Sequence, residues 1–528
     1  MSGTLSPAPD AEGSEVRLGK IARGGALMLG GSGLESLLGF ALAVVAGRLL
    51  GKHDFGLFNL AWQIVALSLV LSELGLPVAV LRYVAVYDGE RDPEGAKGAA
   101  YGGTVVAGVL GVVLGIVLVL GAPTIAERVF HKPEMAPLLP AMALQLPLVG
   151  IMVTLLRVTQ ARGSARHRVL VEKALLPTSR LLFIGGLLAA GGGVVGAAWG
   201  STIAGAVGCV ASIACTAALA RRAWPGARPR WRELWPVLVY SIPLVISTLA
   251  LFGRRRGILM VLGARGTAGD VGLYAAAERT ALAGAMGLNA IGSIFSPIAA
   301  DLYHRKQHDE LGAVLKTSAA WIVMVVLPGA LLLALCPRDV LLAFGRDFPE
   351  AEFALGLLGL AQAINCAYGS VDFLIQMTAK QWGAVLDLTL FALISMGLTY
   401  YLAPRMGVAG AAIAGAVGLL GPRTARVIQV AVRLHMNPFG PGHLRVAACA
   451  VPPALLALLW RGVLSRFLPA HAFWWLIVPG YAALYLLLLP VLAKGEVATL
   501  RQAIQERRKR RAQDETEAGD AGEVESPE

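Results

Sequence analysis

The first apolar stretch of the chain, IARGGALMLGGSGLESLLGFALAVVAGRLL from Ile21 to Leu50, decides the class of fold. A helix needs about 20 mostly apolar residues to cross a bilayer, and this stretch exceeds that length. The apolar core of a secretory signal is shorter, at about 7–15 residues. We therefore interpret residues 21–50 as a retained first membrane span, preceded by a polar cytoplasmic arm at residues 1–20.

The composition extends this interpretation to the whole chain. Hydrophobic residues make up 56% of the 528 residues and charged residues 15%, whereas a soluble domain carries about 25% charged residues. The mean hydropathy is +0.66. The net charge of +12 is typical of Lys and Arg retained in cytoplasmic loops. We therefore expect membrane lipid, and no nucleic acid, among the partners.

The apolar stretches predict an all-α integral membrane protein with about 14 transmembrane helices. Lys and Arg are concentrated in alternate loops, including 158–168 and 221–233, which predicts that both termini are cytoplasmic. The predicted spans are 21–49, 57–82, 100–121, 137–157, 169–190, 194–220, 234–262, 272–300, 313–336, 352–377, 382–403, 407–432, 445–464 and 472–493.

The two halves of the chain resemble each other. Four pairs of motifs recur in the same order, three of them 216 residues apart and the fourth 214. Because an even number of spans separates the copies, we expect two six-helix lobes related by a parallel pseudo-two-fold axis. The pairs are Phe55-Gly56-Leu57-Phe58 with Val271-Gly272-Leu273-Tyr274, Lys132-Pro133-Glu134 with Phe348-Pro349-Glu350, Gln160 with Gln376, and Gly196-Ala197-Ala198 with Gly410-Ala411-Ala412.

This repeat predicts how the chain is organised. An N-terminal lobe would occupy 21–220, a basic cytoplasmic linker 221–233, and a C-terminal lobe 234–434. Two additional transmembrane helices would follow at 435–493, with a charged cytoplasmic tail at 494–528. Two lobes around a central cavity can rock against each other, which alternates access to a site near the middle of the membrane.

Several motifs resemble the Wzx-like polysaccharide flippases of the multidrug/oligosaccharidyl-lipid/polysaccharide (MOP) exporter superfamily. They are Gly47-Arg48-Leu49-Leu50-Gly51 with Phe55-Gly56-Leu57-Phe58, Leu74-Gly75-Leu76, Arg82-Tyr83-Val84-Ala85, Val271 to Arg279, Phe344-Gly345, and Met406 to Ala412. The resemblance covers about residues 15–435. It implies a two-lobed, V-shaped fold that flips undecaprenyl-pyrophosphate-linked sugars.

The triplet Arg254-Arg255-Arg256 is the most unusual feature, because it interrupts an apolar run from Val237 to Leu262. Three successive residues of a helix cannot share one face. The triplet could clamp a pyrophosphate, since arginine offers forked donors that suit phosphate oxygens. Alternatively, the seventh span is only 235–253 and the triplet lies in water at its outer end.

Four further arginines, Arg48, Arg82, Arg157 and Arg279, lie near the ends of predicted spans. Each either extends to the lipid headgroups or adds to a positively charged cavity that suits an anionic substrate.

Four acidic residues, Glu35, Glu73, Glu278 and Asp372, are candidates for coupling or for ion pairs. A carboxylate at membrane depth needs a partner or water. Glu73 lies well inside the second predicted span, where it either titrates and couples transport to protons or forms a structural ion pair.

These features predict a monomeric flippase of the bacterial inner membrane. It would carry a polyprenyl-pyrophosphate-linked oligosaccharide for O-antigen, capsule or exopolysaccharide synthesis by alternating access, with a polysaccharide polymerase and other assembly proteins as partners. The alternatives are a flippase for the peptidoglycan lipid precursor, a cation-coupled drug antiporter of the same superfamily, and a membrane polymerase or ligase.

The polymerase or ligase is disfavoured because the predicted loops are short and carry no convergent catalytic pair. We expect no enzyme activity, no catalytic residue, no cofactor and no metal site. The five cysteines form no CxxC pair, and the sequence has no Walker-type phosphate loop.

Overall fold

The computed structural model describes residues 11–284, 295, 299–378, 381–434, 436–467 and 472–499. These residues are almost entirely helical and include no strand. Parts of the eighth predicted span and most of the predicted tail lie outside the described residues. Many helix side chains that face outward are large and apolar, as lipid contact requires.

The first half of the chain forms a bundle around a long first helix, α1. Helix α1 begins at Ala11, so the second part of the predicted polar arm is helical and continuous with the first span. The helices are α1 (Ala11–Glu73), α2 (Leu76–Gly89), α3 (Pro93–Thr124), α4 (Leu138–Ala143), α5 (Gln145–Ala161), α6 (Ala165–Arg168), α7 (Leu176–Ala189) and α8 (Gly193–Ala223), with a wider helical turn at Val169–Leu175 between α6 and α7.

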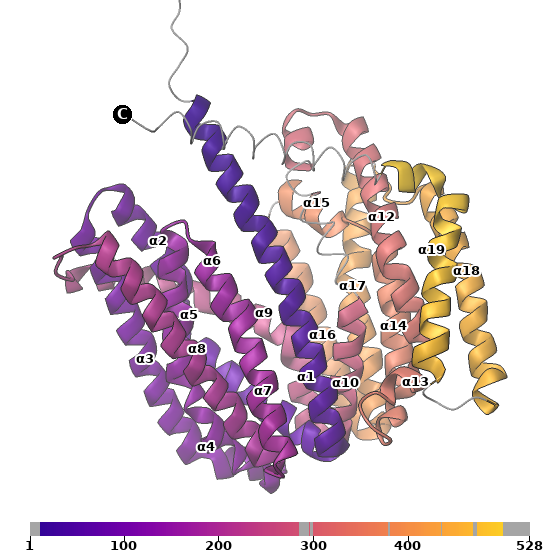
Figure 1. Ribbon diagram of the computed structural model, residues 1–528, viewed down its shortest axis with the longest axis horizontal. Helices are drawn as coiled ribbons and strands as arrows, with labels where there is room; N and C mark the ends of the chain where they lie inside the picture. Colours follow the sequence, from indigo (N-terminus) through magenta and orange to yellow (C-terminus); the bar gives the residue numbers. More distant parts are fainter. Residues whose placement is uncertain are drawn as a thin grey trace, which may run out of the picture.

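The second half of the chain is also helical, and α18 and α19 stand at its end. Its helices are α9 (Leu234–Arg265), α10 (Ala268–Gly284), α12 (His308–Leu335), α13 (Pro337–Leu341), α14 (Glu352–Ala367), α15 (Val371–Thr378), α16 (Gln381–Met406), α17 (Val408–Leu434), α18 (Pro441–Gly462) and α19 (Val478–Leu492). In Figure 1 the helices α2–α8 lie on one side of α1 and the helices α12–α19 lie on the other.

The described helices include eight that are long and apolar enough to cross a membrane, or nine if the bent pair α4 and α5 is one span. This confirms a multi-span helical protein but not the predicted number of 14. The numbers differ partly because breaks divide some predicted spans into short helices. The span predicted at 137–157 bends by 43° at Leu144, and the one predicted at 352–377 is interrupted at 368–370.

Backbone kinks shape α1 and its continuation. The first two predicted spans form one continuous helical run that kinks at Gly51, where φ is 73°. The second span, predicted as unbroken from 57 to 82, is interrupted at Leu74 and Gly75, which both have positive φ. Glycine suits this conformation. It is also required sterically, because a Cβ atom at Gly75 would lie 2.8 Å from the carbonyl oxygen of Ser241 in α9.

The repeated glycines lie at the crossing of α1 and α10, where the two halves of the chain meet. A Cβ atom at Gly56 would lie 1.8 Å from the carbonyl oxygen of Ala268, and one at Gly272 would lie 2.0 Å from that of Lys52. Lys52 and Ala268 are themselves 216 residues apart. The contact is therefore reciprocal, as a two-fold relation between the repeats requires.

Polar and aromatic contacts surround this crossing, at the lower end of the molecule in Figure 1. Lys132 lies in the loop after α3 and donates to the carbonyl oxygens of Gly263 (2.6 Å) and Gly266 (2.9 Å) at the end of α9. Burial lowers the pKa of Lys132. Lys52 forms an ion pair with Glu350, and the Phe55 ring packs edge-on against Phe348. We call these contacts and the crossing the lower junction.

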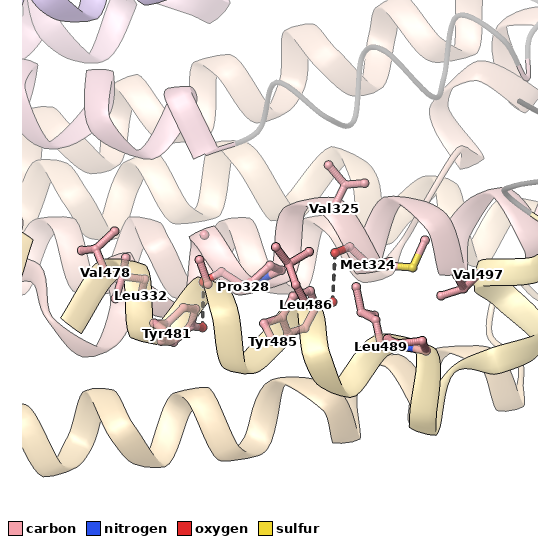
Figure 2. A pocket seen from close by; sticks show the side chains of 13 residues that line it. Met324, Val325, Pro328, Leu332, Val478, Tyr481, Tyr485, Leu486, Leu489 and Val497 are labelled. Carbon is pink, nitrogen blue, oxygen red and sulfur yellow. Dashed lines mark hydrogen bonds between the residues drawn. The ribbon is translucent and has the colours of Figure 1, made fainter. Parts of the chain in front are cut away.

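The helix α19 packs against α12 beside Pro328, as Figure 2 shows. Proline has no N–H, so the Met324 carbonyl one turn earlier loses its helical partner. The Tyr485 hydroxyl donates to that carbonyl oxygen at 2.9 Å, and Tyr481 donates to the Pro328 carbonyl oxygen at 2.8 Å. Apolar side chains of the same helices line a groove of about 680 Å³ there.

Candidate functional site

The arginine triplet lies inside α9, which continues past it to Arg265. The helix therefore does not end at residue 253, while the position of the triplet relative to the membrane stays a prediction. Arg254 and Arg255 are exposed and Arg256 is half-buried. Arg254 and Arg256 project about 200° apart around the helix, so the triplet divides its charges between two sides of α9.

Arg256 belongs to a group of charges contributed by both halves of the chain. It interacts electrostatically with Glu278 and Arg279 of α10. Arg279 also interacts with Glu35 of α1, and both Glu35 and Arg279 interact with Arg180 of α7. We call these five residues the central cluster.

Gly39 of α1 and Trp62 lie beside arginines of the central cluster. A Cβ atom at Gly39 would lie 3.5 Å from the Nη1 atom of Arg279, which is an ordinary van der Waals distance. The Arg180 guanidinium stacks 4.6 Å from the centre of the Trp62 ring, and its Nε atom has no hydrogen-bond partner among the described residues. Arg180 therefore holds a buried donor that no described residue satisfies.

Glu35 connects the central cluster to a second set of charges in the first half. It forms an ion pair with Lys173 at 2.7 Å, and Lys173 lies 3.4 Å from Glu172. Glu172 also pairs with Arg168 at 2.7 Å.

Glu73 and Arg157 lie beside this set of charges. Glu73 is half-buried at the end of α1 and interacts electrostatically with Arg157 and Glu172. The Arg157 Nη1 atom donates to Gln160 at 3.0 Å. Within the described part of the chain Glu73 makes no ion pair at close range, so the choice between titration and ion pairing stays a prediction.

Asp372 lies beside the break between α14 and α15, facing two arginines of α17. Its Oδ1 atom accepts from Arg426 at 2.7 Å, and its Oδ2 atom lies 3.3 Å from Arg423 Nε. Arg423 also donates to Asn365 of α14. Arg254 of α9 interacts electrostatically with Asp372, Arg423 and Arg426. We call these four charged residues the C-terminal cluster.

The remaining three predicted cavity arginines lie elsewhere. Arg48 is exposed near the lower junction, where its Nε atom donates to the Ala343 carbonyl oxygen at 2.6 Å. Arg82 is exposed on α2, with its guanidinium 4.4 Å from the centre of the Tyr240 ring. Arg255 is exposed between the faces of α9 that carry Arg254 and Arg256.

Sequence reasoning missed Arg180, Lys173, Arg423 and Arg426, although all four lie within predicted spans. A signal was available, because a charge inside an apolar run needs a partner or water. Arg423 and Arg426 are also three residues apart, which places them on one face of a helix.

Among the described residues, no group of three or more His, Cys, Asp or Glu side chains could hold a metal ion.

Comparisons with known proteins concern the family and the fold of the chain. A family model described as polysaccharide biosynthesis protein matches residues 21–302. Stage V sporulation protein B of Bacillus subtilis (strain 168) is 30% identical over 129 residues, which is 24% of this chain and 25% of that relative. The match therefore spans about a quarter of that protein's length.

Two solved structures share the fold at low sequence identity. The lipid II flippase MurJ in an inward closed conformation matches with a TM-score of 0.68 and 12% identity, over 88% of this chain and 98% of that one. An inward-facing MATE multidrug transporter of the MOP superfamily matches with a TM-score of 0.60 and 17% identity, over 76% and 94%. These similarities confirm the all-α membrane fold predicted from the sequence.

Proposed function

The chain belongs to the polysaccharide biosynthesis protein family, and from that membership we propose that it flips an undecaprenyl-pyrophosphate-linked oligosaccharide. The product would serve O-antigen, capsule or exopolysaccharide assembly. Members of this group are transporters and flippases of lipid-linked precursors rather than enzymes. The similarity to the lipid II flippase is a similarity of fold. The substrate of this chain therefore has to be inferred from other observations.

The central cluster is the observation that carries this proposal. Its three arginines, Arg180, Arg256 and Arg279, each interact electrostatically with Glu35, Glu278 or both. The excess of positive charge suits a pyrophosphate, because guanidinium forks bind phosphate oxygens in pairs. A drug or cation antiporter would instead require an excess of negative charge at its site.

The same cluster supports transport by alternating access. Its members come from α1 and α7 of the first half and from α9 and α10 of the second, so relative movement of the halves would open or close the site. The lower junction would close the central cluster off from one side of the membrane while the pyrophosphate enters from the opposite side. The polyprenyl tail would stay in lipid throughout.

We place the chain in the bacterial inner membrane with both termini cytoplasmic, as the distribution of Lys and Arg predicts. The lower junction would then face the periplasm. A monomer would suffice for this cycle, and a polymerase would take over the flipped product.

The test is to replace the chromosomal gene with one that encodes Arg256→Ala. We expect surface polysaccharide to fall at least tenfold and lipid-linked oligosaccharide to accumulate, because a charge-assisted bond to phosphate is worth about 1.5–3 kcal/mol. Arg255→Ala is the matched control, since Arg255 is the exposed neighbour outside the central cluster, and it should leave both levels unchanged.

Two outcomes would overturn the proposal, and both are sought in a further strain from which the gene is deleted. Normal surface polysaccharide in a strain that lacks the gene altogether would exclude the oligosaccharide as substrate. Lysis with accumulation of peptidoglycan precursor, at normal polysaccharide levels before lysis, would assign the chain to the peptidoglycan pathway instead.

A further inference from the structure

The four residues of the C-terminal cluster hold three positive charges and one negative charge. Asp372 engages Arg426 through one oxygen and Arg423 through the other. Arg254, the third arginine, makes no hydrogen bond or ion pair within the described part of the chain. Three further guanidiniums, those of Arg255, Arg423 and Arg426, and one carboxylate, that of Asp372, act on Arg254.

The bonds within this cluster leave it prepared for an anion. Asp372 and Asn365 hold the Arg423 guanidinium from two sides, and Asn365 is itself buried and donates to Gln362 at 2.7 Å. Such support fixes the direction of the Arg423 guanidinium, whose five N–H groups exceed these two contacts with described residues. Arg254 is exposed, so a ligand can reach it.

The C-terminal cluster is separate from the central cluster. Arg254 and Arg256 leave opposite sides of α9, and an α-helix with its side chains is about 10–12 Å across. The interactions of Arg254 are with α15 and α17, whereas those of Arg256 are with α10. A single compact pyrophosphate cannot occupy both clusters at once.

We propose that Arg254, Arg423 and Arg426 form a second oxyanion subsite, which takes an acidic group on the glycan of the transported lipid. This inference rests on the proposed function, since it assumes that the pyrophosphate occupies the central cluster. The glycan extends away from the pyrophosphate, so its sugars are the part of the substrate that can reach a second cluster. A carboxylate or phosphate on a sugar would supply a negative counter-charge for Arg254. The proposed substrate class is therefore an acidic oligosaccharide.

The test uses the purified full chain in lipid nanodiscs, titrated calorimetrically with three probes. The probes are inorganic pyrophosphate, a galacturonic acid tetrasaccharide, and maltotetraose as a neutral chain of equal length. We expect the wild type to bind pyrophosphate and the acidic tetrasaccharide independently, and to bind maltotetraose at least tenfold more weakly than the acidic one.

Single substitutions then assign each probe to a cluster. Arg254→Gln should weaken the acidic tetrasaccharide roughly tenfold and leave pyrophosphate within about twofold, because one charge-assisted contact is lost. Arg256→Gln should do the reverse. Arg255→Gln should weaken the acidic tetrasaccharide less than Arg254→Gln does, because Arg255 acts on the subsite only through its charge. Arg254 has no ion pair to lose among the described residues, and retained pyrophosphate binding shows that the variant is folded. Arg423→Gln provides a second variant of the same cluster.

The outcomes separate the two proposals. Equal binding of the acidic and neutral tetrasaccharides, or competition between pyrophosphate and the acidic tetrasaccharide, would overturn the second subsite and leave the proposed function standing. An effect of Arg255→Gln equal to that of Arg254→Gln would also overturn it, since the binding would then be non-specific. A wild type that does not bind pyrophosphate would count against the proposed function itself.

Discussion

At the scale of single residues, Asp372 was a candidate for coupling transport to an ion, but both of its carboxylate oxygens lie against arginines. The sequence allowed it to be either a coupling carboxylate or half of an ion pair. The structure places both of its oxygens against arginines, and the side chain of Arg426 is only 5% exposed. A carboxylate held in this way stabilises buried positive charge.

The first prediction concerns the loss of that carboxylate. Asp372→Asn should lower the free energy of unfolding by about 3–5 kcal/mol, because it leaves buried arginines without their counter-charge. Thermal unfolding of the purified protein in detergent measures the loss. Asp301→Asn is the matched control, since Asp301 pairs with Arg305 at 2.9 Å on an exposed surface and such a pair is worth about 0–1 kcal/mol. Equal effects of the two substitutions would contradict the argument.

At the scale of helices, close approach of backbones decides how α1 and α10 cross. Both crossing glycines belong to the motifs that repeat between the halves, and each abuts a carbonyl of the other helix. A side chain at either position would push the helices apart. The repeat therefore marks the contact between the two halves.

The second prediction tests this crossing. Gly56→Ala should destabilise the protein by about 1–3 kcal/mol through overpacking. Gly397→Ala is the control, because a Cβ atom at Gly397 of α16 meets nothing within 4 Å, and alanine there should stabilise the helix by up to about 1 kcal/mol. Thermal unfolding compares the two variants, and tolerance of alanine at position 56 would refute the close crossing.

The third prediction concerns the contact of α19 with α12. Tyr485→Phe should cost about 1 kcal/mol, because the Met324 carbonyl loses the hydroxyl that satisfies it. In a Pro328→Ala background the cost should be smaller, since alanine at that position would return a backbone N–H to the carbonyl. A double-mutant cycle by thermal unfolding measures the coupling. Strictly additive effects would show that the tyrosine does not compensate for the proline.

At the scale of the whole molecule, the halves are joined at the lower junction by contacts distant in sequence. Lys132 of the first half reaches two carbonyl groups at the end of α9. The helix dipole favours a cation at that end. Opening the lower junction requires breaking these bonds, so they bias the molecule toward the conformation in Figure 1.

The fourth prediction follows from that bias. Lys132→Met should shift the population toward a form with the lower junction open, because the variant keeps an apolar stem but loses both bonds between the halves. Spin labels at Arg128 and Arg346, both exposed, should report longer distances by pulsed electron resonance. Lys97→Met is the control, since Lys97 lies at the opposite end of α3 and donates to Ala227 at 2.8 Å. An unchanged distance distribution in Lys132→Met would exclude this lysine as a lock.

The sequence by itself determined the class of the protein and the positions of most helices. Lipid acts on each segment separately, so an apolar run long enough to cross the membrane is visible without knowledge of its neighbours. The same holds for the repeated glycines, because a repeat is a property of the chain. The family resemblance rests on such local motifs too, and the match over residues 21–302 confirms it.

Only the tertiary structure decided which charges meet. Arg254 and Arg256 are two residues apart, yet they join different clusters with partners from α1, α10, α15 and α17. Arg423 and Asp372 are far apart in sequence and become neighbours because α17 packs beside the break before α15. The direction of a side chain around its helix, and the helix that it meets, depend on packing between distant segments, and no local pattern encodes that packing.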